Sequence, residues 1–343
     1  MTITYRTRRR LRKLGVALGY ITLTAAILFV CWVVWLERFV VYDSNGAKFV
    51  FDYVSPQGST QVAEPPETTP VSIHYNEGDD YMNNSSELTQ LRGYYADAAR
   101  LVESVEGVRK AISQRPAGCA VMLDMKSIYG NFYYSTGLPD AGTTDQVDVT
   151  EVDKLIQALT STDLYVIARI PAFRDRAYGL ENTNYGLPVS SGAYLWSDDK
   201  NCYWLNPTSN GTLSWLVAQA NELRELGFDE VVFTEFCFPD TTNIIFNSSM
   251  SRQEALEAAA ATIVESCATA RFAVSFETTN PEFKLPEGRC RMYLINVEAS
   301  QAADYSQRAN VTDNAINLVF LTTTNDTRFD PYGVMRPMPE ATN

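Results

Sequence analysis

The stretch DEVVFTEF (229–236) contains the features that decide the fold class. After two acidic residues comes a run of β-branched and aromatic residues, 231–234, that is too short for a buried helix, and a proline follows at Pro239. Such runs are typical of strands buried on both faces of a parallel sheet. A carboxylate, Glu235, lies near the end of the stretch, and α/β proteins place their sites at the carboxyl ends of parallel strands.

Similar runs recur along the chain and alternate with helical patterns. The predicted strands are 90–96, 119–125, 163–170, 229–236, 271–277, 291–298 and 316–322, and the predicted helices are 98–113, 150–161, 208–228 and 251–270. This alternation favours parallel βα units and a (β/α)₈ TIM-type barrel over residues 88–343. Residues 278–315 are short for two full βα units, so we expect the C-terminal side to be irregular or incomplete. A doubly wound open sheet is the alternative, although no GxGxxG follows the first strand.

The N-terminal residues differ from the rest of the chain. Residues 1–13 include a cluster of six basic side chains, and residues 14–36 form an uncharged run of 23 residues. This run is long enough to span a bilayer, which predicts a single transmembrane helix with the basic segment in the cytoplasm. Residues 37–87 are then expected to be an extracytoplasmic linker, and the barrel domain is expected outside the cell. A cleaved signal peptide is the alternative, and it also predicts export.

Composition excludes several classes of function. The chain has 28 basic and 41 acidic residues, which disfavours nucleic acid as a partner. The six cysteines lack CxxC spacing, so a zinc site is not expected, and nothing in the sequence indicates a metal or another cofactor. The only histidine, His74, lies in the expected linker. Ser-His, Cys-His and HExxH chemistry are therefore not expected, and carboxylates, Lys, Tyr or Cys would have to transfer protons.

Polar residues follow several predicted strands and form a candidate site. The candidate catalytic carboxylates are Glu235, Glu277 and Asp124. The long connection 171–209 adds aromatic side chains, and aromatic planes can stack on sugar rings. The candidate substrate-binding residues are Asp97, Lys126, Arg169, Asp175, Trp196 and Trp204.

Four segments in this order resemble a known family: AVMLDMKSIYGNFYYST (120–136), YVIARIPAFRD (165–175), LWSDDKNCYWLNP (195–207) and ELGFDEVVFTEFCFP (225–239). They are similar to a bacterial family of glycoside-hydrolase-like proteins with a TIM-barrel domain, which are usually exported or membrane-anchored. The resemblance covers about 89–240. It implies a (β/α)₈ barrel and activity on carbohydrate.

The chain departs from the family pattern in the fourth strand. Thr234 stands where the family has Asp, Glu235 where it has Tyr, and Cys237 where it has Arg. Successive strand residues face opposite sides. If Thr234 faces the barrel mouth, Glu235 should face the helix layer unless a bulge or the strand end redirects it.

Three functions remain open from the sequence. The first is a membrane-anchored glycoside hydrolase that acts on envelope or extracellular polysaccharide through carboxylate acid/base chemistry. The second is a catalytically inactive barrel that binds glycan or a partner protein at the cell surface. The third is an assembly role at the membrane with the barrel as a rigid spacer, which predicts that no open polar pocket exists.

Overall fold

The computed structural model describes residues 40–43, 46–49, 87–116, 118–139 and 141–341. The chain divides into two units, Met1–Asp79 and Asp80–Asn343. In the first unit, β1 (Val40–Asp43) and β2 (Gly46–Phe49) pair as an antiparallel hairpin within the segment expected to be a linker. The predicted transmembrane helix 14–36 lies outside the described residues. Within the described ranges, no helix is long and apolar enough to cross a membrane.

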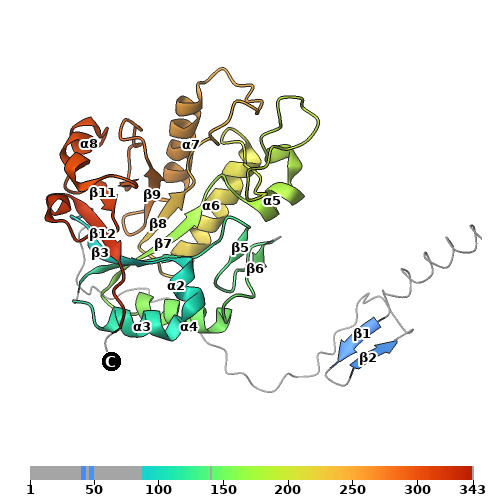
Figure 1. Cartoon of the computed structure of the whole chain (residues 1–343), viewed down its shortest axis with the longest axis horizontal. Helices are drawn as coiled ribbons and strands as arrows, with labels where there is room; N and C mark the ends of the chain where they lie inside the picture. Colours follow the sequence, from blue (N-terminus) through green and yellow to red (C-terminus); the bar gives the residue numbers. More distant parts are fainter. Residues whose placement is uncertain (1–39, 44–45, 50–86, 117, 140, 342–343) are drawn as a thin grey trace, which may run out of the picture. The chain divides into compact units, whose positions relative to one another are not determined.

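The second unit is a closed barrel of eight parallel strands, which confirms the (β/α)₈ prediction (Figure 1). The strands follow one another around the ring in chain order, and the last pairs with the first. They are β3 (Arg92–Ala96), β4 (Ala120–Asp124), β7 (Tyr165–Pro171), β8 (Glu230–Thr234), β9 (Ala273–Thr278), β10 (Met292–Leu294), β11 (Leu318–Leu321) and β12 (Gly333–Pro337). Sequence analysis missed β12, because its residues GVMRP begin with glycine and end with proline, and only two apolar side chains lie between them.

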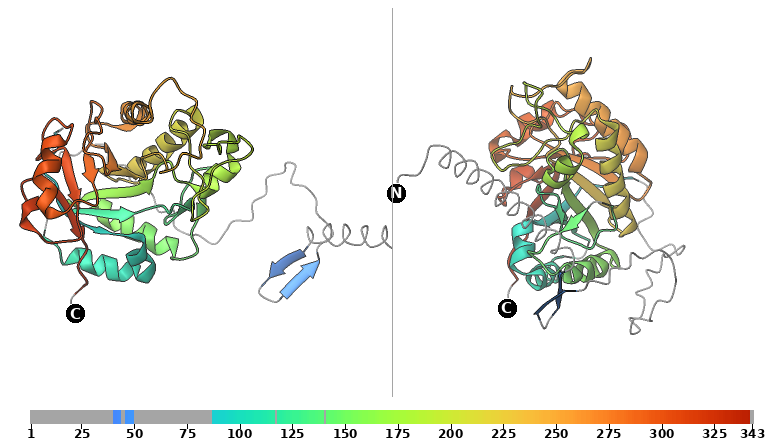
Figure 2. Two further views of the ribbon diagram at one scale, coloured as in Figure 1. Left: turned by 45° about the horizontal axis from the view of Figure 1, so that its top comes forward. Right: turned by 90° about the vertical axis from the view of Figure 1, so that its right-hand side faces the viewer.

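Helices surround the ring of strands, as the two views of Figure 2 show. Their bounds are α2 (Ala98–Glu103), α3 (Val105–Ser113), α4 (Val149–Thr160), α5 (Arg176–Glu181), α6 (Asn210–Glu225), α7 (Arg252–Cys267) and α8 (Ala302–Arg308), with 3₁₀ turns η1 (Thr183–Tyr185), η2 (Ala299–Gln301) and η3 (Thr327–Phe329). No helix separates β9 from β10, and only η3 separates β11 from β12. The predicted C-terminal irregularity therefore affects the helix layer, whereas the strand ring is complete.

Serine side chains determine where some of these helices begin. The predicted helix 98–113 is two helices, because Ser104 adopts an extended conformation and its hydroxyl accepts a hydrogen bond from the N–H of Gly107. Ser251 and Glu254 form a capping box at the start of α7. Such caps are worth about 1 kcal/mol each.

The strands are apolar on both faces, because one face fills the barrel and the other packs against helices. The inner cluster comprises Leu91, Ala120, Met122, Ile167, Val232, Tyr293, Val319 and Met335. The outer cluster includes Val231 and Phe233 of β8 together with side chains of α4, α6 and α7. Gly93 allows β3 and β4 to approach closely, since a Cβ at this position would lie 2.2 Å from the carbonyl oxygen of Ala120.

A buried ion pair closes the amino-terminal end of the barrel interior. The Arg291 Nη1 and Glu230 Oε2 atoms are 2.5 Å apart, and both side chains are almost fully buried. Glu230 also accepts hydrogen bonds from the hydroxyls of Tyr165, Tyr293 and Ser275. Burial raises the pKa of both tyrosines, so they donate as neutral phenols. Every nitrogen of the Arg291 guanidinium donates a hydrogen bond within this network or to a backbone carbonyl.

Candidate active site

The opposite, carboxyl-terminal end of the barrel gathers charged and polar side chains from four neighbouring strands. Asp124 ends β4 and lies beside Arg169 of β7 in the strand register. Thr234 ends β8, and Glu277 lies near the end of β9. Alternation along the strands gives these residues the same orientation as the inner apolar cluster, so they form its uppermost layer.

Arg169 joins two of the predicted carboxylates. Its Nη1 atom lies 3.0 Å from Asp124 Oδ1, and its Nε atom lies 2.9 Å from Glu277 Oε2. The side chain of Asp124 remains 19% exposed, whereas that of Glu277 is only 6% exposed. Asp124 Oδ2 also accepts a hydrogen bond of 3.0 Å from the N–H of Ala98. The structure thus brings these three predicted site residues together at the barrel mouth.

Burial changes the proton affinity of both carboxyl groups. It raises the pKa of Asp124, although the charge of Arg169 and the Ala98 N–H oppose the shift. It also raises the pKa of Glu277, again against Arg169. A carboxyl group with a raised pKa can act as a general acid near neutral pH.

Glu235 is redirected by an unusual backbone conformation at the end of β8. Its φ angle is 51°, in the left-handed region, which costs a residue other than glycine roughly 1–2 kcal/mol. The strand ends at Thr234, so Glu235 does not continue the alternation, and both residues line the same pocket. The Glu235 carboxylate accepts a hydrogen bond of 3.2 Å from Arg174 Nη1. The strand end thus places Glu235 at the barrel mouth.

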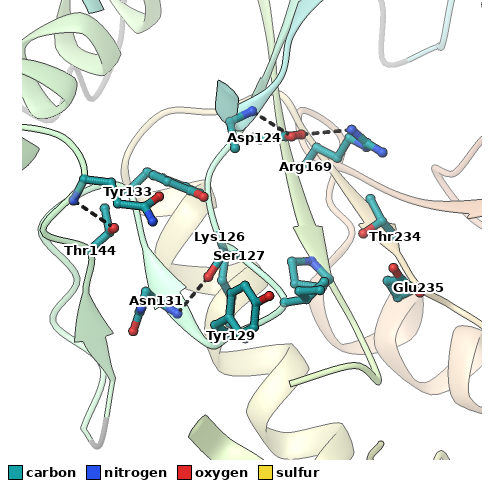
Figure 3. A pocket seen from close by; sticks show the side chains of 14 residues that line it. Asp124, Lys126, Ser127, Tyr129, Asn131, Tyr133, Thr144, Arg169, Thr234 and Glu235 are labelled. Atoms are coloured by element: carbon teal, nitrogen blue, oxygen red, sulfur yellow. Dashed lines mark hydrogen bonds and ion pairs between the residues drawn. The ribbon is translucent and has the colours of Figure 1, made fainter. Parts of the chain in front are cut away.

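A pocket of about 330 Å³ opens at this end of the barrel (Figure 3). Asp124 and Arg169 lie at its base, with Thr234 and Glu235 on the side formed by the end of β8. The other side comes from the segment after β4. The lining residues are Ala98, Asp124, Lys126, Ser127, Ile128, Tyr129, Asn131, Tyr133, Thr144, Gln146, Arg169, Pro171, Thr234 and Glu235.

Lys126 and Asp175 form a buried ion pair with each other. Lys126 Nζ lies 2.6 Å from Asp175 Oδ2 and 2.8 Å from Gln219 Oε1, and both charged side chains have no exposed surface. Burial lowers the pKa of Lys126, while Asp175 opposes this. Asp175 also caps α5 by accepting from the N–H of Tyr178. The predicted substrate-binding residues thus join the segment after β4 to α5 and α6.

The remaining predicted binding residues also have structural contacts, and none of them lines the pocket. Trp204 is 6% exposed, donates to Asp198 and packs under Arg174, while Trp196 is partly buried against the outer core. Asp97 accepts from the N–H of Arg100 and caps α2. Trp196 and Trp204 therefore pack the long connection onto the barrel.

The sequence analysis missed the wall formed by residues 126–146. This segment contains β5 (Asn131–Phe132) and β6 (Gly142–Thr143), which pair in parallel and which were not among the predicted strands. It supplies Tyr129, Tyr133 and Thr144 to the pocket. The available signal was a connection rich in tyrosine and polar residues immediately after a predicted strand.

The described residues offer no obvious metal site. They contain no group of three or more His, Cys, Asp or Glu side chains that could hold a metal ion. Cys119, Cys202, Cys237, Cys267 and Cys290 are free thiols. The chemistry available at this pocket is that of carboxylates, an arginine, hydroxyls and phenols.

The fold and the pocket define a glycoside-hydrolase-like (β/α)₈ barrel. A family model described as "Putative glycosyl hydrolase domain" matches residues 98–277, which is just over half of the chain, and the chain belongs to this family. No curated protein sequence matches the chain.

The first two of the following solved structures support the fold. An inactive D437A mutant of a GH20 exo-β-N-acetylglucosaminidase from Vibrio harveyi aligns with a TM-score of 0.50 at 10% identity, covering 73% of this chain and 50% of that one. A cycloisomaltooligosaccharide glucanotransferase from Paenibacillus sp. aligns with a TM-score of 0.50 at 10% identity, covering 72% of this chain and 40% of that one. A hypothetical protein from Ruminiclostridium thermocellum has 22% identity and a TM-score of 0.46, with 53% and 96% covered. The chain thus spans half or less of the two carbohydrate-active enzymes.

Proposed function

We propose that this protein is a membrane-anchored glycoside hydrolase that acts on an envelope or extracellular polysaccharide. The observation that carries the proposal is that two carboxylates, Asp124 and Glu235, line the same pocket at the carboxyl end of a (β/α)₈ barrel. Hydrolysis of a glycosidic bond needs one carboxyl group as acid and another as base or nucleophile. Family membership supports the reaction class.

The two carboxylates differ in the way these roles require. Asp124 is the proposed general acid, because burial raises its pKa and Arg169 holds it in place. Glu235 is the proposed base or nucleophile, since it is 29% exposed and lies at the pocket wall. Glu277, a catalytic candidate from sequence, is bound to Arg169 and does not line the pocket. It is better suited to positioning Arg169.

Release of reducing ends tests the proposal. The full-length chain, purified in detergent because 14–36 is predicted to span the membrane, is incubated with peptidoglycan, chitin and neutral and acidic exopolysaccharides. We expect Glu235→Gln to lower the rate at least 100-fold, which is within the range of general acid–base catalysis. Glu265→Gln, an exposed carboxylate on α7, is the matched control and should retain activity. No release by the wild-type chain from any substrate would refute the proposal.

A second candidate function is glycan binding without hydrolysis. It is favoured by Thr234 at the position of the family aspartate, and by Arg169, which occupies both Asp124 and Glu277. This function predicts that the protein binds polysaccharide and releases no reducing ends, and that Glu235→Gln binds as well as the wild-type chain. The rigid-spacer function predicted no open polar pocket, and the pocket argues against it.

The proposed location is testable separately. If 14–36 anchors the protein with its N-terminus in the cytoplasm, protease added to intact spheroplasts should remove residues 88–343 from the cell surface. A domain that stays protected until the membrane is opened would contradict this orientation.

A further inference from the structure

The pocket wall after β4 presents one tyrosine on a tight turn. The turn is closed by hydrogen bonds between Ser127 and Gly130 and between Ser127 and Asn131. Gly130 has a φ angle of 90°, and a Cβ there would lie 2.6 Å from Asp175 Oδ1 and from Ala177 Cβ. The turn is therefore pressed against the start of α5. Tyr129, one residue before this glycine, is held in a fixed position by its own backbone.

Two further bonds connect the turn to α5. The N–H of Arg176 donates to the Ile128 carbonyl at 3.0 Å, and the N–H of Ala177 donates to the Tyr129 carbonyl at 3.2 Å. The buried Lys126–Asp175 pair lies beneath them. The backbone that carries Tyr129 is thus fixed from both sides. A side chain on such a support can bind a ligand with little loss of conformational entropy.

Tyr129 remains exposed although the tyrosines that follow it are buried. Its exposure is 43%, compared with 5% for Tyr133 and 0% for Tyr134. Figure 3 shows Tyr129 on the wall that faces Thr234 and Glu235. Serine, threonine and amide side chains, namely Ser127, Asn131, Thr144 and Gln146, complete this side of the pocket. An aromatic face that a fixed backbone presents among hydroxyl and amide groups suits a ring that is apolar on its face and hydroxylated at its edge.

The charges of the pocket indicate which rings it accepts. The basic residues among its lining are Lys126 and Arg169, and each is bound to carboxylates of the protein. Arg174, which contacts Glu235, is also bound to Asp198. An anionic ligand would have to compete for these cations, and it would be repelled by the Glu235 carboxylate. The electrostatics therefore favour a ligand without negative charge.

We infer that Tyr129 is the specificity platform of the pocket and that it stacks on an uncharged sugar ring, whereas rings with a carboxylate, such as uronates and sialic acids, are rejected. This inference rests on the proposed function for the identity of the site. It goes further by naming the residue that binds the ring and the charge class of the substrate. It also replaces Trp196 and Trp204 as the stacking residues.

A glycan array tests the inference with the full-length Asp124→Asn chain, which lacks the proposed acid but keeps the Glu235 charge, so that hydrolysis does not remove the ligand. The probes are neutral and N-acetylated oligosaccharides together with uronate-containing and sialylated ones. We expect binding to neutral probes only. Adding Tyr129→Ala should weaken it about tenfold, the upper end for loss of an aromatic contact. Tyr129→Trp should retain binding.

The control is Tyr194→Ala, which removes a tyrosine that is 69% exposed but does not line the pocket, and it should bind like the parent chain. A preference for acidic probes, equal binding by Tyr129→Ala, or no binding to any probe would overturn the inference. The two proposals fail separately. Tyr129-dependent binding by a wild-type chain that releases no reducing ends would refute the hydrolase and leave the platform standing.

Discussion

The two ends of the barrel each contain an arginine bound to a glutamate, but they differ in how completely the charges are satisfied. At the amino-terminal end, Arg291 is 1% exposed and donates to Glu230, the Tyr165 hydroxyl and the carbonyls of Ile316 and Thr89. At the carboxyl-terminal end, Arg169 is 21% exposed and lies beside an open pocket.

One barrel thus combines a closed structural network at one end with an open pocket at the other. A buried ion pair whose hydrogen-bonding capacity is filled by hydroxyls and carbonyls of the protein gains nothing by exchanging partners. Removing one charge of such a pair leaves the other uncompensated. Charges at the edge of a pocket can exchange a protein partner for a ligand or a proton. The residue types are the same, so solvent access and the number of hydrogen-bond partners decide the role.

The largest expected effect is at the closed end. Glu230→Ala should lower the free energy of unfolding by about 3–5 kcal/mol, because it leaves Arg291 buried without its carboxylate. Urea denaturation of the full-length chain measures this. Glu282→Ala, which breaks an exposed pair with Arg308, is the control and should change the same quantity by less than about 1 kcal/mol. A loss of similar size in both variants would show that the closed network is not special.

The second prediction concerns the open end. Asp124→Asn should reduce kcat/KM for polysaccharide by about 10²–10⁴-fold, because asparagine cannot donate the proton that a general acid supplies. The free energy of unfolding should fall much less than in Glu230→Ala, since Asp124 remains partly solvated. Rates and denaturation curves on the same preparations separate the two effects. If Asp124→Asn unfolds as readily as Glu230→Ala, both ends are structural and the comparison fails.

Sequence alone located the barrel and most of the upper layer. Because parallel strands end on the same rim, residues such as Asp124 and Arg169 could be assigned to one site from their positions at strand ends. It could not identify partners. Lys126 follows the strand that Asp124 ends, yet its ammonium group forms an ion pair with Asp175, 49 residues away in the sequence. Pairing across the helix layer is a tertiary contact that no local pattern reveals.

Two other features depended on backbone geometry. Strand alternation predicted that Glu235 would face the helix layer, away from the barrel mouth. Its left-handed φ angle at the strand end places it in the pocket instead. Tyr129 lies in a turn fixed by contacts with α5, so its exposure could not be distinguished from that of buried Tyr133 and Tyr134 in the sequence. Loop residues receive their roles from the scaffold that holds them.

The third prediction concerns the pH dependence at the open end. The proposed acid must be protonated, so kcat/KM should decline as pH rises above the pKa of Asp124. The charge of Arg169 lowers this pKa. Arg169→Gln should therefore shift the alkaline limb of the pH–rate profile to higher pH by about one unit, equivalent to roughly 1.4 kcal/mol.

Arg169→Lys is the matched control for this prediction, because it keeps the charge and loses the guanidinium geometry. Both variants should be slower than wild type, but only the glutamine variant should shift the limb. A pH–rate profile with an unmoved limb in Arg169→Gln would show that the group that titrates is not in contact with Arg169.

The smallest expected effect returns to the closed end and concerns Asp229, the neighbour of Glu230. Asp229 accepts a hydrogen bond from the N–H of Val166, and burial raises its pKa to about 6. The folded state therefore binds more protons than the unfolded state between about pH 4 and pH 6. The free energy of unfolding should decrease as pH rises through this window, by about 1–2 kcal/mol from this group because it is partly exposed.

Asp229→Asn keeps an acceptor for Val166 and should remove that slope, whereas Asp229→Ala should also remove it but lower stability at every pH. If the slope persists in Asp229→Asn, a group other than Asp229 titrates in this window. If it disappears, Asp229 carries the pH dependence, and a partly exposed carboxyl group can exchange a proton with solvent even at the closed end of the barrel.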